Sequence, residues 1–491
     1  MSAVAERPVR GVAPDRYAPS RTSRFAWLRE RGMGATMLIS GISSAFGVVL
    51  LSATGYIAAA LQSDPYYGGS PTLAVVVGML GGLFLVIAVY IASIVTANTF
   101  ATIIAGRTRD IARMRLIGAS ARSQRAAVAR QGLIVGAIGA VAGLIVGAAG
   151  VVAAVPMLDR LLGVDSAYDA FVPQLVIPAA AVALTTWAAA WAGSRRVLDV
   201  TPLQALGGSV ERTHEDLRGR PVRNRVVAAV GVFGILLLAG GIGLGLLTPL
   251  GVLVAFVGGL LSFTALTLGA SVVMPRLLAL TGRLFGSSAA AKLAAQNALR
   301  YPERSSRMAI GVVMGVALVV MFAVASESAK VLVAASSGPG EDAAFDQMMD
   351  SFATVMIALV AVSAVIAAVG LVNLLTIGVV QRRRELALLR ALGLTGRQVR
   401  RMVLIEAAHV TLTALAFGLV LGVAYGWAGA QSLLGSIPMP PGWEAPTFVA
   451  PGIPWLTVAV VVAVTAVLTL VAAVAPTRIA TRTAPVEALA E

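Results

Sequence analysis

The chain contains the same charged segment twice, once in each half of its length. The first copy runs from Arg109 to Arg125 and the second from Arg384 to Arg400, and six of the seventeen aligned pairs are identical. Aligned pairs in the same gapless register include Asn98/Asn373, Gly118/Gly393, Ser120/Thr395, Gly143/Gly418 and Gly147/Gly422. A further match, of Thr201–Leu206 with Ala484–Leu489, lies in a register shifted by eight positions. We therefore expect two similar halves, with the extra eight residues of the second half lying between the two matches.

Composition indicates an integral membrane protein. Hydrophobic residues make up 58% of the chain and charged residues only 12%, whereas about a quarter of the residues of a soluble domain are charged. Ten apolar stretches are each long enough to cross a bilayer, which takes about 20 residues. They are Met33–Leu61, Leu73–Ala105, Gly132–Met157, Pro173–Gly193, Val226–Leu247, Pro249–Met274, Met308–Ser326, Phe352–Val380, Ala407–Leu434 and Pro454–Ala475. A backbone in lipid must satisfy its own hydrogen bonds, so we expect an all-α, polytopic fold.

The distribution of charge predicts the orientation in the membrane. One set of alternate loops contains two basic residues, Arg160 and Lys330, and ten acidic ones, while the rest of the chain holds 36 basic and 13 acidic residues. Because basic residues favour the cytoplasmic side, both termini are expected in the cytoplasm. The net charge of +15 is then a topology signal, and it does not indicate nucleic-acid binding.

The repeats predict a domain organisation of four, two and four spans. Residues 1–32 are expected to form a cytoplasmic tail that can contact membrane lipids, and 33–210 are expected to form the first four-span repeat. Residues 211–290 supply a linker and spans five and six, and 291–491 form the second repeat. Six spans separate equivalent positions, so the two halves are expected to have the same orientation.

Each copy of the repeated segment is predicted to be a short amphipathic helix at the membrane surface. In the second copy, apolar residues recur at helical spacing, and Gly393 and Gly396 are expected to break the helix. A basic loop would by itself satisfy the charge rule. A gapless duplication of acidic, glycine and hydroxyl positions instead favours docking of a partner. The candidate docking residues are Arg109, Asp110, Arg113, Arg115, Gly118, Arg384, Glu385, Arg390 and Gly393.

These segments resemble the FtsX-like permease family of ABC transporters, which includes the MacB-type and bacitracin-efflux-type permeases. The resemblance rests on Arg-Glu-Leu-Ala-Leu-Leu-Arg-Ala-Leu-Gly-Leu-Thr at 384–395 and on Ala-Pro-Val-Glu-Ala-Leu at 484–489. It also includes the segment from Asn297 to Arg304, which is similar to an amphipathic elbow before a span. Some relatives carry a large extracellular domain between spans seven and eight, but here that connection is only Glu327–Ser351.

The resemblance implies a permease subunit in the plasma membrane of a bacterium. Its repeated segments would be coupling helices that contact two copies of a separate ABC ATPase. ATP and Mg would be bound by that partner, and an accessory membrane protein or lipoprotein could belong to the same assembly. The expected function is export or extraction of an amphipathic, lipid-like or peptide substrate, or mechanical signalling across the membrane.

The chain lacks the residues needed to hydrolyse ATP. A phosphate-binding P-loop requires lysine after glycine, but Lys292 and Lys330, the two lysines, both follow alanine. No cysteine is present, which excludes thiolate metal sites. We therefore expect no cofactor in this chain and no enzymatic activity of its own.

Polar residues inside the spans leave two alternatives open. Asn98 and Asn373 could line a pathway or act as a hinge, although we favour hydrogen bonds between helices. Glu406 and His409 could form a proton relay, which would suit an ion-coupled secondary transporter. A membrane regulator without transport is a further alternative.

Overall fold

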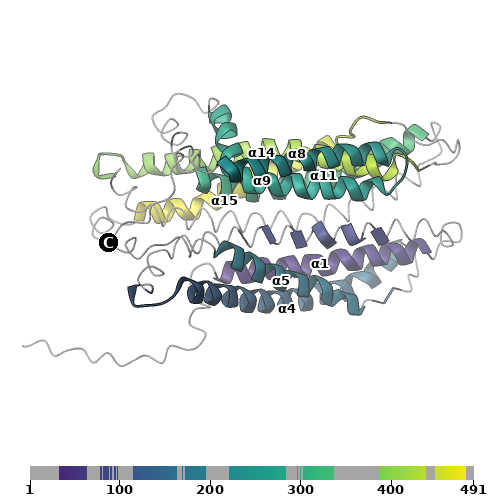
Figure 1. The fold of residues 1–491 in the computed structure, drawn as a ribbon, viewed down its shortest axis with the longest axis horizontal. Helices are drawn as coiled ribbons and strands as arrows, with labels where there is room; N and C mark the ends of the chain where they lie inside the picture. Colours follow the sequence, from purple (N-terminus) through teal and green to yellow (C-terminus); the bar gives the residue numbers. More distant parts are fainter. Residues whose placement is uncertain are drawn as a thin grey trace, which may run out of the picture.

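The described part of the chain consists mainly of long helices (Figure 1). The computed structural model describes residues 33–62, 116–162, 172–194, 221–282, 302–336, 390–437 and 448–482, with separate positions between 78 and 97 and at 114, 168, 169, 296, 299 and 388. No strand occurs among these residues, in agreement with the predicted all-α class. Most of the predicted docking residues lie outside the described part.

The described helices keep the labels of Figure 1. In chain order they are α1 (Met33–Gln62), α4 (Ala121–Leu162), α5 (Val176–Gly193), α8 (Pro221–Gly245), α9 (Gly251–Gly282), α11 (Pro302–Ser336), α14 (Gly396–Leu434) and α15 (Trp455–Arg482). A short 3-10 turn, Pro173–Leu175, precedes α5.

Among the described residues, seven helical segments are long and apolar enough to cross a membrane. They coincide with the first, third, fourth, fifth, sixth, seventh and ninth predicted stretches. The tenth stretch corresponds to α15, whose described apolar part, Trp455–Leu470, is shorter. The second and eighth stretches lie outside the described residues, apart from the separate positions between 78 and 97.

Two of the helices begin far earlier than hydropathy predicts. α4 begins at Ala121 and α14 at Gly396, each eleven residues before the predicted stretch, which is about 16 Å of helix. The prediction that Gly396 breaks the helix is wrong, because Gly396 is the first helical residue after the cap at Thr395. Hydropathy identifies only the apolar part of a helix, while arginine and glutamine also favour helical structure.

The helices pack as two groups, which Figure 1 shows one above the other. One group contains α1, α4 and α5, and the other contains α8, α9, α11, α14 and α15; all of the extensive helix contacts lie within one group or the other. The centre of the larger group is an apolar core of α9, α11 and α14 that includes Met274, Val313 and Ala414. Isolated described residues between 78 and 97 lie between the two groups in Figure 1.

Glycines bring α4 against α1 and α14 against α11 in the same register. A Cβ on Gly143 would overlap the carbonyl oxygen of Gly41, and one on Gly418 would lie 3.1 Å from the carbonyl oxygen of Val313. The four corresponding contacts are Gly143 with Gly41 and Ser44, Gly147 with Ala45 and Val48, Gly418 with Val313 and Val316, and Gly422 with Ala317 and Val320. The sequence repeat aligns Gly143 with Gly418 and Gly147 with Gly422. The four residues that they contact have the same spacing on α1 as on α11. The two helix pairs therefore use matching contacts.

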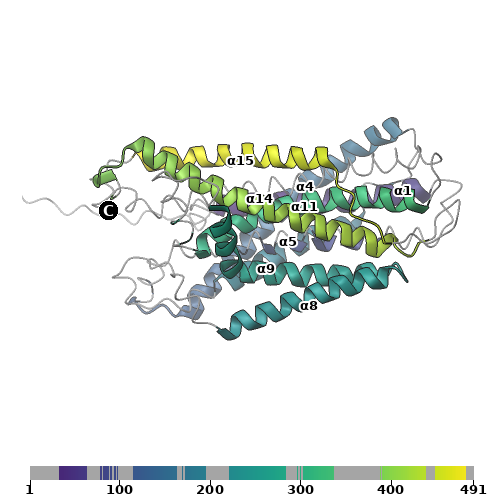
Figure 2. The same cartoon turned by 90° about the horizontal axis from the view of Figure 1, so that it is seen from above.

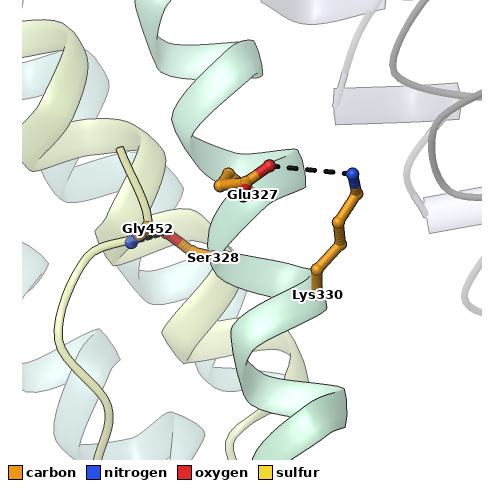
Figure 3. A network of polar contacts seen from close by, with 4 residues as sticks. All are labelled: Glu327, Ser328, Lys330 and Gly452. Carbon is orange, nitrogen blue, oxygen red and sulfur yellow. Dashed lines mark hydrogen bonds and ion pairs between the residues drawn. The ribbon is translucent and has the colours of Figure 1, made fainter. Parts of the chain in front are cut away.

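The two ends of the structure differ in charge. The end where α4 and α14 begin carries the described arginines Arg122, Arg125, Arg130, Arg397, Arg400 and Arg401 and is called the basic end. At the opposite, acidic end, the Tyr56 hydroxyl donates to Asp159 Oδ1 at 2.8 Å and so joins α1 to α4. In the other group, the segment before α15 packs on α11, where the Gly452 amide donates to Ser328 Oγ at 3.1 Å beside the Glu327–Lys330 ion pair (Figure 3).

Candidate functional site

Two turns at the basic end have the same backbone conformation. The first turn, Ile117–Ser120, contains Gly118 with φ +101°, and the second turn, Leu392–Thr395, contains Gly393 with φ +104°. These are the described glycines with positive φ, and they are aligned in the sequence repeat. Positive φ is strained for residues that carry a Cβ, and no atom lies within 4 Å of the Cβ position at either glycine. The need for glycine therefore arises from the backbone and not from crowding.

Hydrogen bonds at each turn end one helical segment and begin the next. In the first turn, the Ala119 amide donates to the Met114 carbonyl at 2.9 Å, as in a Schellman end with glycine at C′. In the second turn, the Leu392 amide donates to the Leu388 carbonyl at 2.9 Å. Each turn therefore closes a helical end that projects from the membrane helices.

The residue two positions after each glycine caps the long helix that follows. The Ser123 amide donates to Ser120 Oγ at 3.1 Å, and the Gln398 amide donates to Thr395 Oγ1 at 3.3 Å. The Gln398 side chain in turn accepts from the Thr395 amide at 2.8 Å, which completes a capping box. The hydroxyls that the sequence repeat aligns thus fix the first residues of α4 and α14.

An apolar side chain projects from each turn immediately before the glycine. Ile117 is 80% exposed and Leu392 is 73% exposed, and the sequence repeat aligns these two positions. Met114 and Leu116, in the helical segment before the first turn, are also about half exposed. Exposed apolar patches that are surrounded by charged residues often mark protein interaction sites. The first turn and the second turn are therefore two similar candidate docking surfaces.

The first turn has an additional attachment to its own helix group. Arg125 lies over the Trp191 ring, 3.9 Å from its centroid, and Arg125 Nη2 donates to the Trp191 carbonyl at 3.2 Å. This joins the start of α4 to the end of α5. The aligned residues of the second half are Arg400 and Val474, so the stacking partner is absent there from the sequence.

Three predicted docking residues fall within the described part of the chain. Gly118 and Gly393 form the turns, and Arg390 lies partly buried in the helical segment before the second turn. The others lie outside the described residues: Arg109, Asp110, Arg113, Arg115, Arg384 and Glu385, and also the pathway or hinge candidates Asn98 and Asn373.

Glu406 and His409, the candidate relay pair, are buried in α14. His409 Nε2 lies 2.8 Å from the Leu278 carbonyl oxygen and 3.1 Å from Thr281 Oγ1, both on α9. This ring nitrogen is therefore used in a contact between helices. Within the described residues, no group of three or more acidic, histidine or cysteine side chains could hold a metal ion.

Comparison with protein families gives one result that covers both turns. The model of the FtsX-like permease C-terminal domain matches residues 82–202 and 357–485, about half of the chain. The chain belongs to the FtsX-like permease family. No curated protein is significantly similar to it in sequence.

The two matched segments of this FtsX-like permease follow the internal repeat. The first residues of the two segments, 82 and 357, follow the same alignment as Arg109 and Arg384. Their last residues, 202 and 485, follow the alignment of Thr201 with Ala484, which is shifted by eight positions. The two segments that match this family model therefore lie at equivalent positions of the sequence repeat. The first segment contains the first turn, α4 and α5, and the second contains the second turn, α14 and α15.

The helix pair α8 and α9 lies between the two matches. FtsX-like permeases are transport components of ABC systems, typically work with an ABC ATPase and are generally not enzymes themselves.

Sequence reasoning identified the charged and glycine positions of this FtsX-like permease but not Ile117 and Leu392. The sequence does not show whether a single aliphatic residue beside a membrane span is exposed, because the same residue could also lie on the buried apolar face of a helix. The repeat offered one usable signal, since both copies keep an aliphatic residue immediately before the glycine.

Proposed function

We propose that this chain is the membrane subunit of an ABC transporter and that it docks two copies of a separate ABC ATPase, one at each turn. Ten spans would form two repeats of four on either side of α8 and α9, with repeats at 33–210 and 291–491, a linker with two spans at 211–290 and a tail at 1–32. The basic end, and with it both termini, would lie in the cytoplasm, in accordance with the distribution of basic residues.

One observation carries this proposal: Ile117 and Leu392 are aligned, highly exposed and placed beside glycines with the same backbone conformation. A single exposed aliphatic residue needs no explanation. Two equivalent ones in duplicated turns, each followed by a capped helix that enters the membrane, suit a partner that is itself present twice. Burial of such a side chain at an interface contributes about 1.5 to 3 kcal/mol.

ATP hydrolysis by the partner would move each turn and the helix that follows it. The turns are connected directly to α4 and α14 through the caps at Ser120 and Thr395, so a force on a turn acts along a continuous helix of 42 or 39 residues. ATP and Mg²⁺ would be held by the ATPase. The short external connections favour a substrate taken from the membrane, such as an amphipathic, lipid-like or peptide molecule, and export or extraction over import. Mechanical signalling across the membrane is the alternative use of the same movement.

The docking role is tested by charge substitution at the two exposed residues. We expect Ile117→Asp and Leu392→Asp each to weaken binding of the partner ABC ATPase by about tenfold, and the double variant to lose binding, because a carboxylate at the centre of an apolar contact loses its hydration. Leu247→Asp is the matched control, since Leu247 is 81% exposed and lies in the turn between α8 and α9 at the acidic end. The measurement is retention of the ATPase on the immobilised permease in detergent or nanodiscs.

Full retention of the ATPase by the double variant would refute the docking role. Retention of the ATPase together with ATP hydrolysis that moves no substrate would instead identify a membrane regulator. Transport driven by an ion gradient without any ATPase would support the secondary-transporter alternative.

A further inference from the structure

The helix pair α8 and α9 connects the two halves in sequence but is attached mainly to one of them. α9 packs extensively on α14 and α11, and α8 packs on α14, whereas their contacts with α1, α4 and α5 are at most slight. Figure 2 shows α8 and α9 as adjacent helices on one side of α14 and α11. The pair therefore belongs structurally with the second half.

Polar contacts along the length of α9 join it to α14. Ser262 Oγ lies 2.9 Å from the Tyr425 hydroxyl, and Thr281 Oγ1 lies 2.6 Å from Thr413 Oγ1. The Leu278 carbonyl lies between these two positions of α9 and is 2.8 Å from His409 Nε2. The contacts run over about 28 Å of helix. Because they occur at several levels, α9 and α14 cannot slide past each other without breaking more than one of them.

The first half lacks the side chains for equivalent contacts. The residues of α4 aligned with His409, Thr413 and Tyr425 are Ile134, Ile138 and Gly150. None of these side chains forms hydrogen bonds. The attachment of α9 to α14 is therefore a departure from the two-fold repeat and gives the second half a component that the first does not have.

The opposite contact of α9 is with Tyr90, which lies in the first of the two family segments. The Tyr90 hydroxyl lies 2.7 Å from Thr264 Oγ1 and 3.4 Å from the Leu260 carbonyl oxygen. The Tyr90 ring meets Phe263 edge-on at a centroid distance of 6.2 Å, and Phe263 lies 6.5 Å from the Tyr425 ring. α9 thus lies between Tyr90 of the first half and α14 of the second.

The Tyr90 contact is suited to sliding. The Thr264 hydroxyl donates to the Leu260 carbonyl at 2.6 Å, which leaves its oxygen to accept from Tyr90. The Tyr90 hydroxyl therefore has two acceptors on α9, Thr264 Oγ1 and the Leu260 carbonyl oxygen, which lie only 2.6 Å from each other. A small shift of Tyr90 exchanges one acceptor for the other and leaves its hydroxyl hydrogen-bonded. His409 also faces two oxygens of α9, but an exchange there does not release α14, because Ser262 and Thr281 hold α14 at separate levels of α9.

From this arrangement we infer that α9 and α14 move as one rigid unit during the ATPase cycle and that the first half slides against this unit at the contact of Tyr90 with α9. Movement of the second turn is then passed through α14 to α9, which shifts relative to Tyr90. The first turn has no equivalent route through an inserted helix, so the two ATPase contacts act unequally. This inference rests on the proposed docking of an ATPase.

The absence of cysteine from the chain allows a direct test with two engineered pairs. Tyr90→Cys with Thr264→Cys reports on the sliding contact, and Ser262→Cys with Tyr425→Cys reports on the rigid one. Each double variant is reconstituted with the ATPase in nanodiscs and treated with a short bifunctional thiosulfonate, either without nucleotide or after trapping with ATP and vanadate. We expect trapping to lower cross-linking of the 90–264 pair at least threefold and to leave that of the 262–425 pair unchanged.

The same pairs test whether the sliding is required for turnover. Cross-linking of positions 90 and 264 should slow ATP hydrolysis at least fivefold, and reduction should restore it, whereas cross-linking of positions 262 and 425 should leave the rate unchanged. Equal cross-linking of 90–264 in both states, or loss of 262–425 cross-linking on trapping, would overturn the inference while ATPase binding is retained. A parent chain that retains no ATPase would overturn the proposed function and this inference together.

Discussion

Two glycines determine the shape of the candidate docking surfaces. Gly118 and Gly393 adopt φ values of +101° and +104°, and each lies in open space, so the cost of any side chain there comes from the backbone. For a residue with a Cβ, that cost is about 1 to 2 kcal/mol. The turns can therefore be altered without disturbing the packing of the membrane helices.

A prediction at the residue scale follows for Gly393. We expect Gly393→Ala to weaken ATPase binding by about tenfold, because the alanine favours turn conformations other than the one observed, and to leave the thermal unfolding temperature of the permease almost unchanged. Gly429→Ala is the matched control: Gly429 also lies in open space, but it has an ordinary helical conformation within α14. Equal ATPase binding by the two variants in a titration would show that the turn conformation does not matter for docking.

Helix pairs in each half depend on close backbone approach. α4 contacts α1 at Gly143, and α14 contacts α11 at Gly418, but the two contacts are not equally tight. A Cβ on Gly143 would overlap the Gly41 carbonyl oxygen, whereas a Cβ on Gly418 would lie 3.0 Å from side-chain atoms of Val316. Small residues at such contacts let membrane helices pack closely, and the tighter contact tolerates substitution less well.

This difference predicts an order of stabilities among alanine variants. Gly143→Ala should lower the free energy of unfolding by about 1 to 3 kcal/mol through overpacking. Gly418→Ala should lower it less, because its Cβ would lie 3.0 to 3.1 Å from the nearest atoms of Val316 and Val313 and would not overlap them. Gly150→Ala should be neutral or slightly stabilising, because Gly150 is open and alanine has the higher helix propensity. Thermal unfolding in one detergent measures all three. A Gly143→Ala variant as stable as Gly150→Ala would contradict the packing described for α1 and α4.

Sequence reasoning was most successful where the repeat provided a second observation of the same position. It predicted that Gly118 and Gly393 correspond and that Ser120 and Thr395 belong to the same local structure, and the structure gives them matching conformations and caps. It could not predict which side chains are exposed, because exposure depends on how distant helices pack. The partner of His409 was also hidden, since the acceptor at Leu278 is a backbone carbonyl and any residue type would supply it.

On the scale of the whole molecule, a repeated framework carries an asymmetric component. Matching glycine contacts and matching turns recur in the two halves, while α8 and α9 attach mainly to the second. A two-fold framework suits a pair of identical ATPases. In the proposed complex, the attachment of α9 to α14 would make the two ATPase contacts mechanically different, so a defect at the second turn is expected to affect turnover more strongly than the same defect at the first.

The most direct test of the central claim is photo-crosslinking of the assembled complex. The photoreactive residue p-benzoylphenylalanine replaces Ile117, Leu392 or Leu247 in separate preparations, and the bound ATPase is identified by its mass after irradiation. The account predicts that positions 117 and 392 both cross-link to the ATPase and that position 247, which is equally exposed at the acidic end, does not. An actively hydrolysing complex in which neither position 117 nor position 392 cross-links would contradict it.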